Sequence, residues 1–448
     1  MFNCMIKKVL IANRGEIAVR VIRTCKEMGL KTVSIYSEAD RDCMHVKLAD
    51  KSVCIGPAEA SKSYLDIPRI MSAIEVSGAD AVHPGYGFLA ENPRFAEIVS
   101  ASNKIFIGPP SHVLELIGDK IRSKEVAKKV GIPLVPGSDG CVDIKEAIDT
   151  ANRIGYPVVI KASAGGGGRG IRVVRNEKEL REKLPLAIEE AKVAFGDGRV
   201  YIEKYLINPK HIEVQVLADK YGHVISLGER ECSIQRRNQK LIEEAPSISI
   251  SEEQRKQIEE ATIEFCRAIG YEGAGTVEFL MDQDGNFYFM EMNGRIQVEH
   301  PVTEMITGID IVKWQIKIAR GERLNIKSVE RRGFAIEFRI NAEDPNNFMP
   351  TPGKIEELYL PGGFGVRVDT HIYCGYAVPP YYDSLLAKLI VWGEDRKSVI
   401  RRAKRALEEF VISGQGLKTN IDFHRRVIST REFAEGKHHI KFIEEMMV

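Results

Sequence analysis

Short β-branched runs separated by helix-like patterns fill the first quarter of the chain. The strand-like runs occupy residues 7–12, 32–37, 53–55, 80–82 and 105–107, and residues 16–28 and 66–77 between them repeat apolar positions at helical spacing. Strands that alternate with helices form a parallel sheet covered on both faces. We therefore expect an α/β domain over residues 1–115, followed by linker helices over residues 116–136.

The pattern changes after residue 133, where Pro, Gly, Ser and Asp interrupt it. A helix (144–154), a strand (158–161), a glycine loop, a strand (171–174) and a long helix then predict a small lid domain over residues 137–205. From residue 211 onward apolar and polar residues alternate, which indicates antiparallel strands, with helices over 251–269 and 312–319. We expect residues 206–448 to form a mixed or antiparallel C-terminal domain, so the chain combines α/β and α+β architecture.

A hairpin over residues 278–300 carries the clearest chemical signal. Asp-Gly at 284–285, between two apolar runs, predicts a two-residue turn that sets Glu278 opposite Glu291. Like charges opposite each other on paired strands are destabilising, so a cation is expected there. Two carboxylates with the amide of Asn293 suit magnesium on substrate phosphates rather than zinc. The alternative is a solvated hairpin edge with unpaired acids.

A lysine followed by glycines marks a second candidate site. Lys161 ends a predicted strand, and the loop that follows contains four consecutive glycines (165–168), whose backbone can approach a phosphate closely. It is not a P-loop, because there the lysine follows the glycines; a hairpin tip without function is the alternative. The segment 201–206 is a plausible hinge and adenine-recognition strand. Residues 13–16 lack the dinucleotide fingerprint, which excludes a nicotinamide or flavin domain.

Composition excludes several classes of protein. Lys plus Arg number 64 against 63 for Asp plus Glu, a balance that argues against nucleic acid or an anionic membrane as partner. No apolar run reaches transmembrane length, and the start of the chain is typical of a first strand rather than a signal peptide. Eight scattered cysteines without Cys-x-x-Cys spacing fit reduced thiols, so we expect a cytoplasmic enzyme.

Taken together, these segments resemble the ATP-grasp enzymes and specifically the biotin carboxylases. The resemblance covers essentially the whole chain. It is carried by residues 11–18 (IANRGEIA), 83–89 (HPGYGFL), 161–170 (KASAGGGGRG), 231–237 (ECSIQRR), 295–304 (RIQVEHPVTE), 339–345 (RINAEDP) and 379–384 (PPYYDS).

The resemblance implies that ATP lies between lid and body, with lysines on its phosphates and two Mg²⁺ or Mn²⁺ ions beside them. The implied metal ligands are Glu278, Glu291 and Asn293. The implied ATP contacts are Lys120, Lys161, Gly166, Gly167, Gly168, Glu203, Lys204, Leu206, His211, Gln235, Asn238, Glu278 and Glu291.

The resemblance also implies that bicarbonate attacks the terminal phosphate and gives carboxyphosphate, which then carboxylates biotin. Glu299 would be the general base and Arg339 would stabilise the biotin enolate. The implied bicarbonate contacts are Lys240, Arg295, Gln297, Val298 and Glu299; the implied biotin contacts are Tyr86, Arg339 and Asp383; and the implied catalytic residues are Lys240, Arg295, Glu299 and Arg339.

Two positions depart from the usual family pattern. Asn238 stands where many members have His, so any role for a histidine charge there is in doubt. Gly294 stands where the family usually has Thr, Pro or Ala. Because glycine adds backbone freedom to the unfolded chain, we expect reduced rigidity of the loop that presents Arg295.

The chain ends at Val448 without the Met-Lys-Met segment that carries covalent biotin. We therefore expect biotin on a separate carrier protein, and expect a homodimeric biotin carboxylase subunit that works with carboxyltransferase subunits. Acetyl-CoA carboxylase is the simplest assembly, and a pyruvate or propionyl-CoA carboxylase is the alternative. Two rivals stay open, namely another ATP-grasp ligase and a regulatory subunit that binds ATP without turnover.

Overall fold

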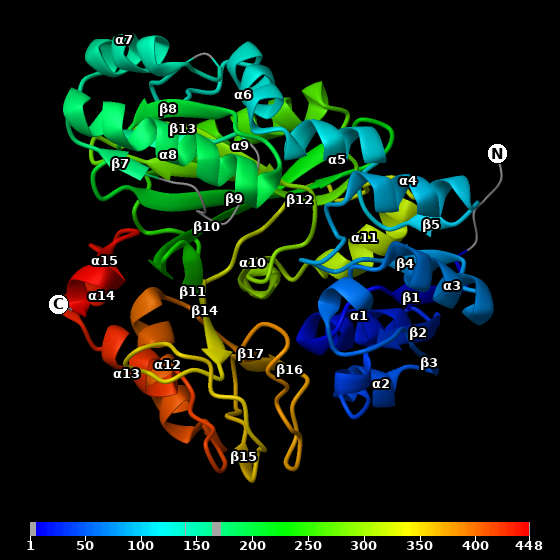
Figure 1. Cartoon of the computed structure of the whole chain (residues 1–448). Helices are drawn as coiled ribbons and strands as arrows, with labels where there is room; N and C mark the ends of the chain where they lie inside the picture. The colour runs from blue at the N-terminus through cyan, green and yellow to red at the C-terminus, as the bar shows by residue number, and fades with distance from the viewer. Residues whose placement is uncertain (1–5, 139, 164–171, 448) are drawn as a thin grey trace.

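The computed structural model describes residues 6–138, 140–163 and 172–447. Its N-terminal part is a five-stranded parallel sheet in the order β3-β2-β1-β4-β5, at the right of Figure 1. This confirms the expected parallel sheet, with strand ends within two residues of those predicted. The strands are β1 (Lys8–Ile11), β2 (Lys31–Tyr36), β3 (Lys51–Cys54), β4 (Ala81–His83) and β5 (Ile105–Phe106), and the helices are α1 (Gly15–Glu27), α2 (Met44–Leu48), α3 (Ile67–Ser77) and α4 (Pro93–Ala101).

Two helices of this part begin where the sequence supplies caps. The side chain of Asp66 accepts from the backbone N–H of Arg69, and the side chain of Asn92 accepts from that of Phe95. Each cap is followed by a proline within the first two helical positions. Capping and proline together satisfy the free N–H groups of a first turn, which fixes where α3 and α4 start.

A three-stranded antiparallel sheet, β7-β6-β8, forms the small unit at the top of Figure 1. Its apolar core lies between this sheet and two helices. The elements are α7 (Ile144–Ile154), β6 (Val158–Ala162), β7 (Arg172–Val174), α8 (Glu177–Phe195) and β8 (Val200–Lys204), preceded by α5 (Ser111–Gly118) and α6 (Lys120–Lys129). The expected phosphate contacts Gly166, Gly167 and Gly168 lie outside the described residues.

An eight-stranded antiparallel sheet in the order β13-β12-β9-β10-β11-β14-β17-β16 runs through the rest of the molecule. This confirms the antiparallel C-terminal expectation and the combined fold class. The strands are β9 (Lys210–Ala218), β10 (Val224–Arg236), β11 (Gln239–Ala245), β12 (Gly273–Met281), β13 (Phe287–Asn293), β14 (Phe334–Asn341), β16 (Val366–Thr370) and β17 (Leu385–Gly393), and the helices beside them are α9 (Glu252–Ala268), α10 (His300–Thr307) and α11 (Ile311–Ala319).

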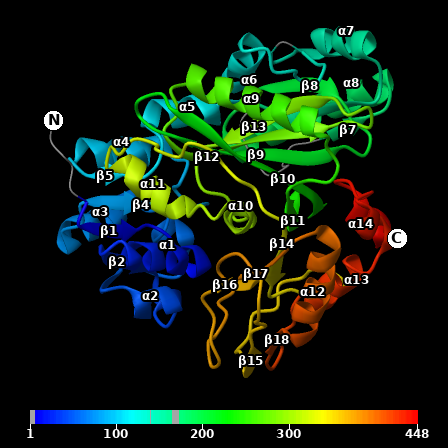
Figure 2. The same cartoon turned by 180° about the vertical axis from the view of Figure 1, so that it is seen from behind.

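The chain closes on a second apolar core beneath this sheet. Figures 1 and 2 both place it at the bottom of the molecule, with α10 between it and the N-terminal sheet. Its elements are β15 (Glu357–Tyr359), which pairs with β18 (Val411–Ser413), α12 (Arg396–Glu409), α13 (Ile421–Val427), α14 (Arg431–Glu435) and α15 (Phe442–Met446).

The hairpin between β12 and β13 differs from the prediction in its turn. The N–H of Asp282 donates to the carbonyl of Asn286 (3.0 Å) and Gly285 has φ +83°, so the loop has three residues and the predicted two-residue turn is wrong. Phe279 pairs with Phe289, one residue out of the predicted register. A bulge then lies between this pair and the next. Because the bulge offsets the longer turn, Glu278 still pairs with Glu291, as predicted.

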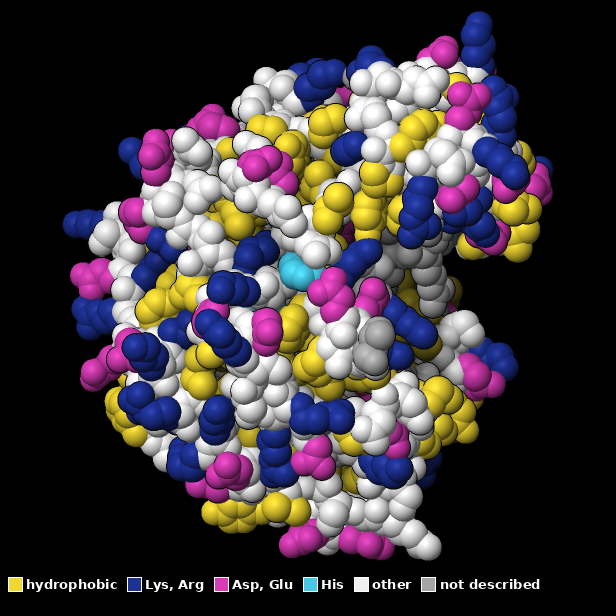
Figure 3. Space-filling model, turned by 90° about the vertical axis from the view of Figure 1, so that its left-hand side faces the viewer, with side chains coloured by type: hydrophobic (Ala, Val, Ile, Leu, Met, Phe, Trp, Pro, Cys, Tyr) yellow, Lys and Arg dark blue, Asp and Glu magenta, His cyan; other side chains and the backbone are white. Residues whose placement is uncertain are grey.

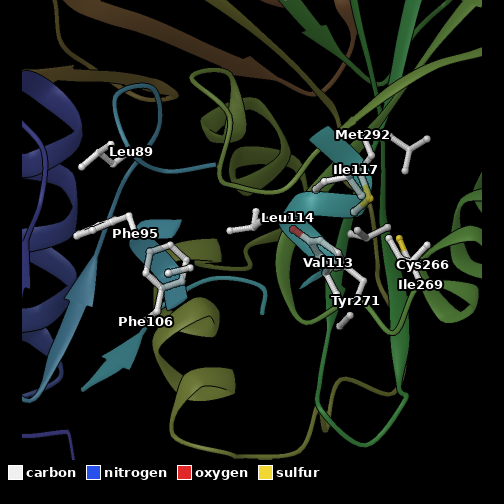
Figure 4. Packing of buried hydrophobic residues seen from close by; sticks show 14 of the residues in the cluster. Leu89, Phe95, Phe106, Val113, Leu114, Ile117, Cys266, Ile269, Tyr271 and Met292 are labelled. Atoms are coloured by element: carbon white, nitrogen blue, oxygen red, sulfur yellow. The ribbon is translucent and has the colours of Figure 1, made fainter. Parts of the chain in front are cut away.

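Helix α5 joins the N-terminal sheet to the large one. Figure 4 shows Leu114 on α5 between Phe106 and Tyr271, and Ile117 beside Met292 of β13. One continuous apolar cluster therefore supports both sheets at the level of the hairpin. None of the helices among the described residues is both long and apolar enough to span a membrane. The seven described cysteines are all free thiols.

Candidate active site

A cavity of 1320 Å³ lies between the small unit, the large sheet and the N-terminal part. Figure 3 shows a notch in the outline of the molecule, with Lys and Arg side chains on both sides. Glu299 does not line the cavity and is fully buried. The other described candidates all line it, namely Tyr86, Lys120, Lys161, Glu203, Lys204, Leu206, His211, Gln235, Asn238, Lys240, Glu278, Glu291, Asn293, Arg295, Gln297, Val298, Arg339 and Asp383.

Lys240 and the carboxylates of Glu213, Glu278 and Glu299 around it form the charged floor of this cavity. Its Nζ donates to Glu213, to Glu278 Oε1 (2.9 Å) and to Glu299 Oε1 (2.6 Å). Burial alone would lower the pKa of Lys240, but the three carboxylates raise it well above its usual value. Lys240 is therefore protonated at neutral pH, and it lies at the junction of the predicted metal and bicarbonate sites.

Glu278 has polar neighbours from four segments of the chain. Besides Lys240, it lies 3.1 Å from His211 Nε2 and accepts from Asn293 Nδ2 (3.0 Å) and Gln297 Nε2 (3.1 Å). Burial opposes ionisation, yet the charges of Lys240 and His211 hold the pKa of this carboxyl well below its usual value. Glu278 is thus an ionised acid at the cavity wall.

The predicted metal ligands meet at this wall. Glu291 faces Glu278 across the hairpin and lies 3.5 Å from Lys120 Nζ, while Asn293 is bonded to Glu278. Carboxylate and amide oxygens with a lysine nearby fit a divalent ion that bridges phosphates. Ligand atoms of His211, Glu213 and Glu278 also lie within 4.8 Å of one another, so the structure adds an imidazole that the all-oxygen expectation did not include.

The residues after Asn293 form a loop, because β13 ends at Asn293. Arg295 donates from Nη2 to Asn293 Oδ1 (3.0 Å) and from Nη1 to Gln297 Oε1 (3.0 Å). Its Nε is held by Glu91 Oε2 (2.8 Å), and Glu91 Oε1 accepts from the N–H of Gly294 (2.8 Å). Glu91 therefore anchors this loop at two adjacent residues.

Arg339 and Glu299 form the inner end of the site. Arg339 Nη2 donates to Glu299 Oε2 (2.9 Å), and its Nε donates to Glu243. Burial would raise the pKa of Glu299, but Lys240 and Arg339 hold it well below the usual value. Next to Glu299, the carbonyl of Val298 accepts from Lys388 Nζ (2.9 Å), which fixes the backbone there.

Glu203 is the last residue but one of β8, at the junction of the small unit and the body. Its carboxylate accepts from Lys161 Nζ (2.6 Å) and from Lys124. Burial opposes the effect of these two lysines, which nevertheless lower the pKa of Glu203 to about 2. The next residue, Lys204, donates to the carbonyls of Gly155 (3.0 Å) and Tyr156 (3.2 Å).

Tyr86 and Asp383 lie at the opposite side, where they also line a small cavity of 150 Å³. The hydroxyl of Tyr86 donates to Glu16, and burial raises the pKa of Tyr86 well above its usual value. Asn13 donates to the carbonyl of Tyr86 (2.7 Å), so the first strand-to-helix turn positions this tyrosine.

Asn238 occupies the turn between β10 and β11 with φ +64°. Asparagine adopts this left-handed conformation more readily than most residues, since its short side chain can bond locally. The departure from histidine is therefore compatible with the turn.

Several site residues were not predicted. Arg230 is fully buried and donates to Glu213 and to Gln215 (2.8 Å). Lys124 follows Lys120 by four residues on α6, and that helical spacing was a usable signal. Nothing in the sequence marked Glu91, Glu213, Glu243 or Arg230, because their partners come from distant strands.

The chain is similar to known proteins over nearly its whole length. Models of the biotin carboxylase N-terminal domain, the carbamoyl-phosphate synthase L chain ATP-binding domain and the biotin carboxylase C-terminal domain match residues 5–114, 119–327 and 337–445. A biotin carboxylase of Haemophilus influenzae is 55% identical over 99% of both chains. The Campylobacter jejuni biotin carboxylase–β-γ-ATP complex superposes with a TM-score of 0.96, at 50% identity over 99% of both chains. The biotin carboxylase domain dimer of Hydrogenobacter thermophilus 2-oxoglutarate carboxylase, with MgADP, ADP and bicarbonate, gives 0.94 at 54% identity over 98% of both chains.

Proposed function

The chain belongs to the biotin carboxylase family of ATP-grasp enzymes, and on that premise we propose how its residues divide the reaction. The enzyme carboxylates biotin with ATP and bicarbonate. The observation that carries the division of roles is the position of Lys240, which bonds Glu278 on one side and Glu299 on the other. One cation thus joins the phosphate end of the cavity to its bicarbonate end.

Lys120 and Lys161 hold the ATP phosphates, and Glu278, Glu291 and Asn293 would hold the divalent ions beside them. When bound, Mg²⁺ supplies charge neutralisation for the transferred phosphoryl group. Lys161 is bonded to Glu203, as is Lys124. The carboxylate of Glu203 therefore positions these two lysines to bind phosphate. Lys204 and Leu206 border the adenine.

Bicarbonate lies between Lys240 and Arg295, with Gln297 and the backbone of Val298 beside it. The guanidinium of Arg295 suits a planar anion because it presents two parallel N–H groups. Bicarbonate oxygen attacks the terminal phosphate and ADP leaves, which gives carboxyphosphate.

Glu299 takes the proton of bicarbonate. In the present arrangement both of its oxygens are bonded to cations, which makes it a weak base. When Lys240 and Arg339 turn toward their anionic substrates, Glu299 loses these partners and its basicity rises. Substrate binding thereby activates the base only when bicarbonate is in place.

Arg339 stabilises the biotin enolate, and Tyr86 and Asp383 border the biotin ring. Carboxyphosphate gives carbon dioxide, and the released phosphate removes the ureido proton. Closure of the lid over residues 137–205 keeps water from the intermediate. We propose that the chain divides into an N-terminal domain (1–115), linker helices (116–136), the lid (137–205) and a C-terminal domain (206–448).

Biotin reaches the site on a separate carrier protein, in an assembly with carboxyltransferase subunits, and the enzyme works as a cytoplasmic homodimer. The similarity to the dimeric Hydrogenobacter domain supports the dimer. Acetyl-CoA carboxylase is the proposed assembly. The second candidate is a pyruvate or propionyl-CoA carboxylase assembly. A keto-acid acceptor is supported by the 2-oxoglutarate carboxylase domain, which is about as identical to this chain as the Haemophilus biotin carboxylase is. Identification of the transferase that copurifies with the chain separates them.

ADP release in the presence of free biotin and bicarbonate tests the proposal. We expect release to require both, and Arg339→Ala to lose the biotin-dependent part while ATP binding persists. ADP release that ignores biotin would favour another ATP-grasp ligase, and ATP binding without turnover would favour a regulatory subunit.

A further inference from the structure

Two buried glutamates close to Arg339 accept too few hydrogen bonds. Glu243 on β11 and Glu337 on β14 are directly opposite each other in the sheet, and both are fully buried. Residues opposite each other on antiparallel strands have Cβ atoms about 4.5–5.5 Å apart, so their carboxyls lie within reach of each other. Two ionised carboxylates in this position would repel strongly.

The hydrogen bonds of this pair are incomplete. Glu243 Oε1 accepts from Arg339 Nε, but Glu243 Oε2 and both oxygens of Glu337 have no donor among the described residues. A buried acceptor without a donor costs free energy, and three adjacent ones are rarely tolerated. A single proton between the two carboxyls pairs one oxygen of Glu337 with Glu243 Oε2, which satisfies two of these three oxygens and removes one of the two charges.

The charged groups around Glu337 do not supply that donor. Arg339, two residues along β14, is bonded to Glu243 and Glu299. Lys388, opposite Arg339 on β17, donates to the carbonyl of Val298 and lies 3.1 Å from Glu16.

Helix α10 also packs against β14 and brings His300 and Glu304. His300 Nδ1 faces the carbonyl of Gln297 (2.8 Å), so the neutral ring donates there and presents Nε2 as an acceptor. Burial lowers the pKa of His300 well below its usual value, which keeps the ring neutral. Glu304 is bonded to Arg20 (2.8 Å) and Arg367 (2.8 Å).

We propose that Glu243 and Glu337 share one proton, so that Glu337 is a neutral positioning residue that donates to Glu243 and leaves a single negative charge to hold Arg339 for biotin carboxylation. The inference deepens the proposed role of Arg339 and rests on it. Burial raises the pKa of Glu243 to about 7 against the charge of Arg339, and raises the pKa of Glu337 well above its usual value. Loss of the shared proton at alkaline pH places a second negative charge beside Arg339.

Infrared spectroscopy reads the proton without reference to activity. At a pH of about 7.5, roughly one unit above the ordinary pKa of histidine, we expect the whole enzyme to show the C=O band of a protonated carboxyl. This band should be absent from Glu337→Gln. A difference spectrum without such a band would overturn the proposal. This readout is independent of the assigned reaction, so failure of the proposed function leaves it interpretable.

Kinetics then test positioning. Because glutamine mimics the neutral acid, Glu337→Gln should keep biotin-dependent ADP release within about twofold at neutral pH. The proposal also predicts that the rate of the unaltered enzyme declines at alkaline pH and that this decline is absent from Glu337→Gln. Glu243→Gln removes the anion that holds Arg339 and should lower kcat by up to about 10²-fold, with KM for ATP unchanged.

Glu229→Gln is the matched control, because Glu229 is also a buried carboxylate bonded to an arginine (Arg255, 2.9 Å), but Arg255, unlike Arg339, does not line the cavity. It should leave the rate and its pH profile unchanged. Equal losses in Glu337→Gln and Glu243→Gln, or an alkaline decline that persists in Glu337→Gln, would refute the shared proton.

Discussion

Gly294 gives opposite predictions from sequence and from structure, so replacing it decides between them. From the sequence, glycine loosens the loop that presents Arg295, and Gly294→Ala should stabilise the protein by about 0.4–1 kcal/mol through the unfolded chain. In the structure a Cβ at this position would lie 2.6 Å from Ile117 Cδ1 and 2.9 Å from Leu114 Cδ2. Both side chains belong to the buried cluster in Figure 4.

The structural magnitude follows from these two contacts. Adding a methyl group to a well-packed core costs about 1–3 kcal/mol, and the gain in the unfolded chain offsets part of it. We therefore expect Gly294→Ala to lose about 0.5–2 kcal/mol, which corresponds to a fall of about 1–4 °C in the thermal midpoint at ~2 °C per kcal/mol. The loop anchor at Glu91 should also weaken, so KM for bicarbonate should rise.

The assay is thermal unfolding followed by circular dichroism, with ADP release measured in parallel. Gly118→Ala is the matched control, because a Cβ there meets nothing within 4 Å and it should raise the midpoint. Ile117→Val removes the methyl group at 2.6 Å, and in the double variant it should recover part of the loss. A midpoint for Gly294→Ala at or above that of the unaltered protein would refute the close approach and support the loose loop.

The remaining predictions concern charges in the cavity. Arg339→Ala should lower biotin-dependent ADP release by about 10²–10³-fold, with nucleotide affinity by calorimetry unchanged. Lys240→Met leaves three buried carboxylates without their shared cation and should cost about 3–5 kcal/mol. The pKa values of Glu278 and Glu299 then rise, so the urea midpoint of this variant should recover as pH falls from about 8 to about 5.5, and equal deficits at both pH values would contradict this. Glu203 has its pKa lowered to about 2, so its stabilisation is complete above the unfolded value of about 4.3 and is lost as pH falls toward 2. Hydrogen exchange of β6 and β8 should show that loss, and Glu203→Gln should flatten it.

The order of elements was predictable because it depends on local pattern. Strand and helix periods, the caps at Asp66 and Asn92, and the change to alternation after residue 211 are properties of short segments. The hairpin shows the limit of such reasoning. A three-residue turn and a bulge each shift the register by one, and neither is marked in the sequence, yet the pairing of Glu278 with Glu291 follows because the shifts cancel.

The charged floor was predictable in its members only where one short segment or the family resemblance supplied them. Lys240, Glu278 and Glu299 were expected at their sites, but the bonds that make Lys240 their common partner join three separate segments. Glu213 and Arg230 complete that floor from β9 and β10, and on those strands they differ in no local feature from exposed polar residues. An ion pair between distant strands depends on sheet order and register, and turns and bulges fix the register here. The ion pairs of the site could therefore not be predicted before the fold was known. The same reasoning explains why the donor shortage at Glu337 becomes visible only when every neighbouring strand is in place.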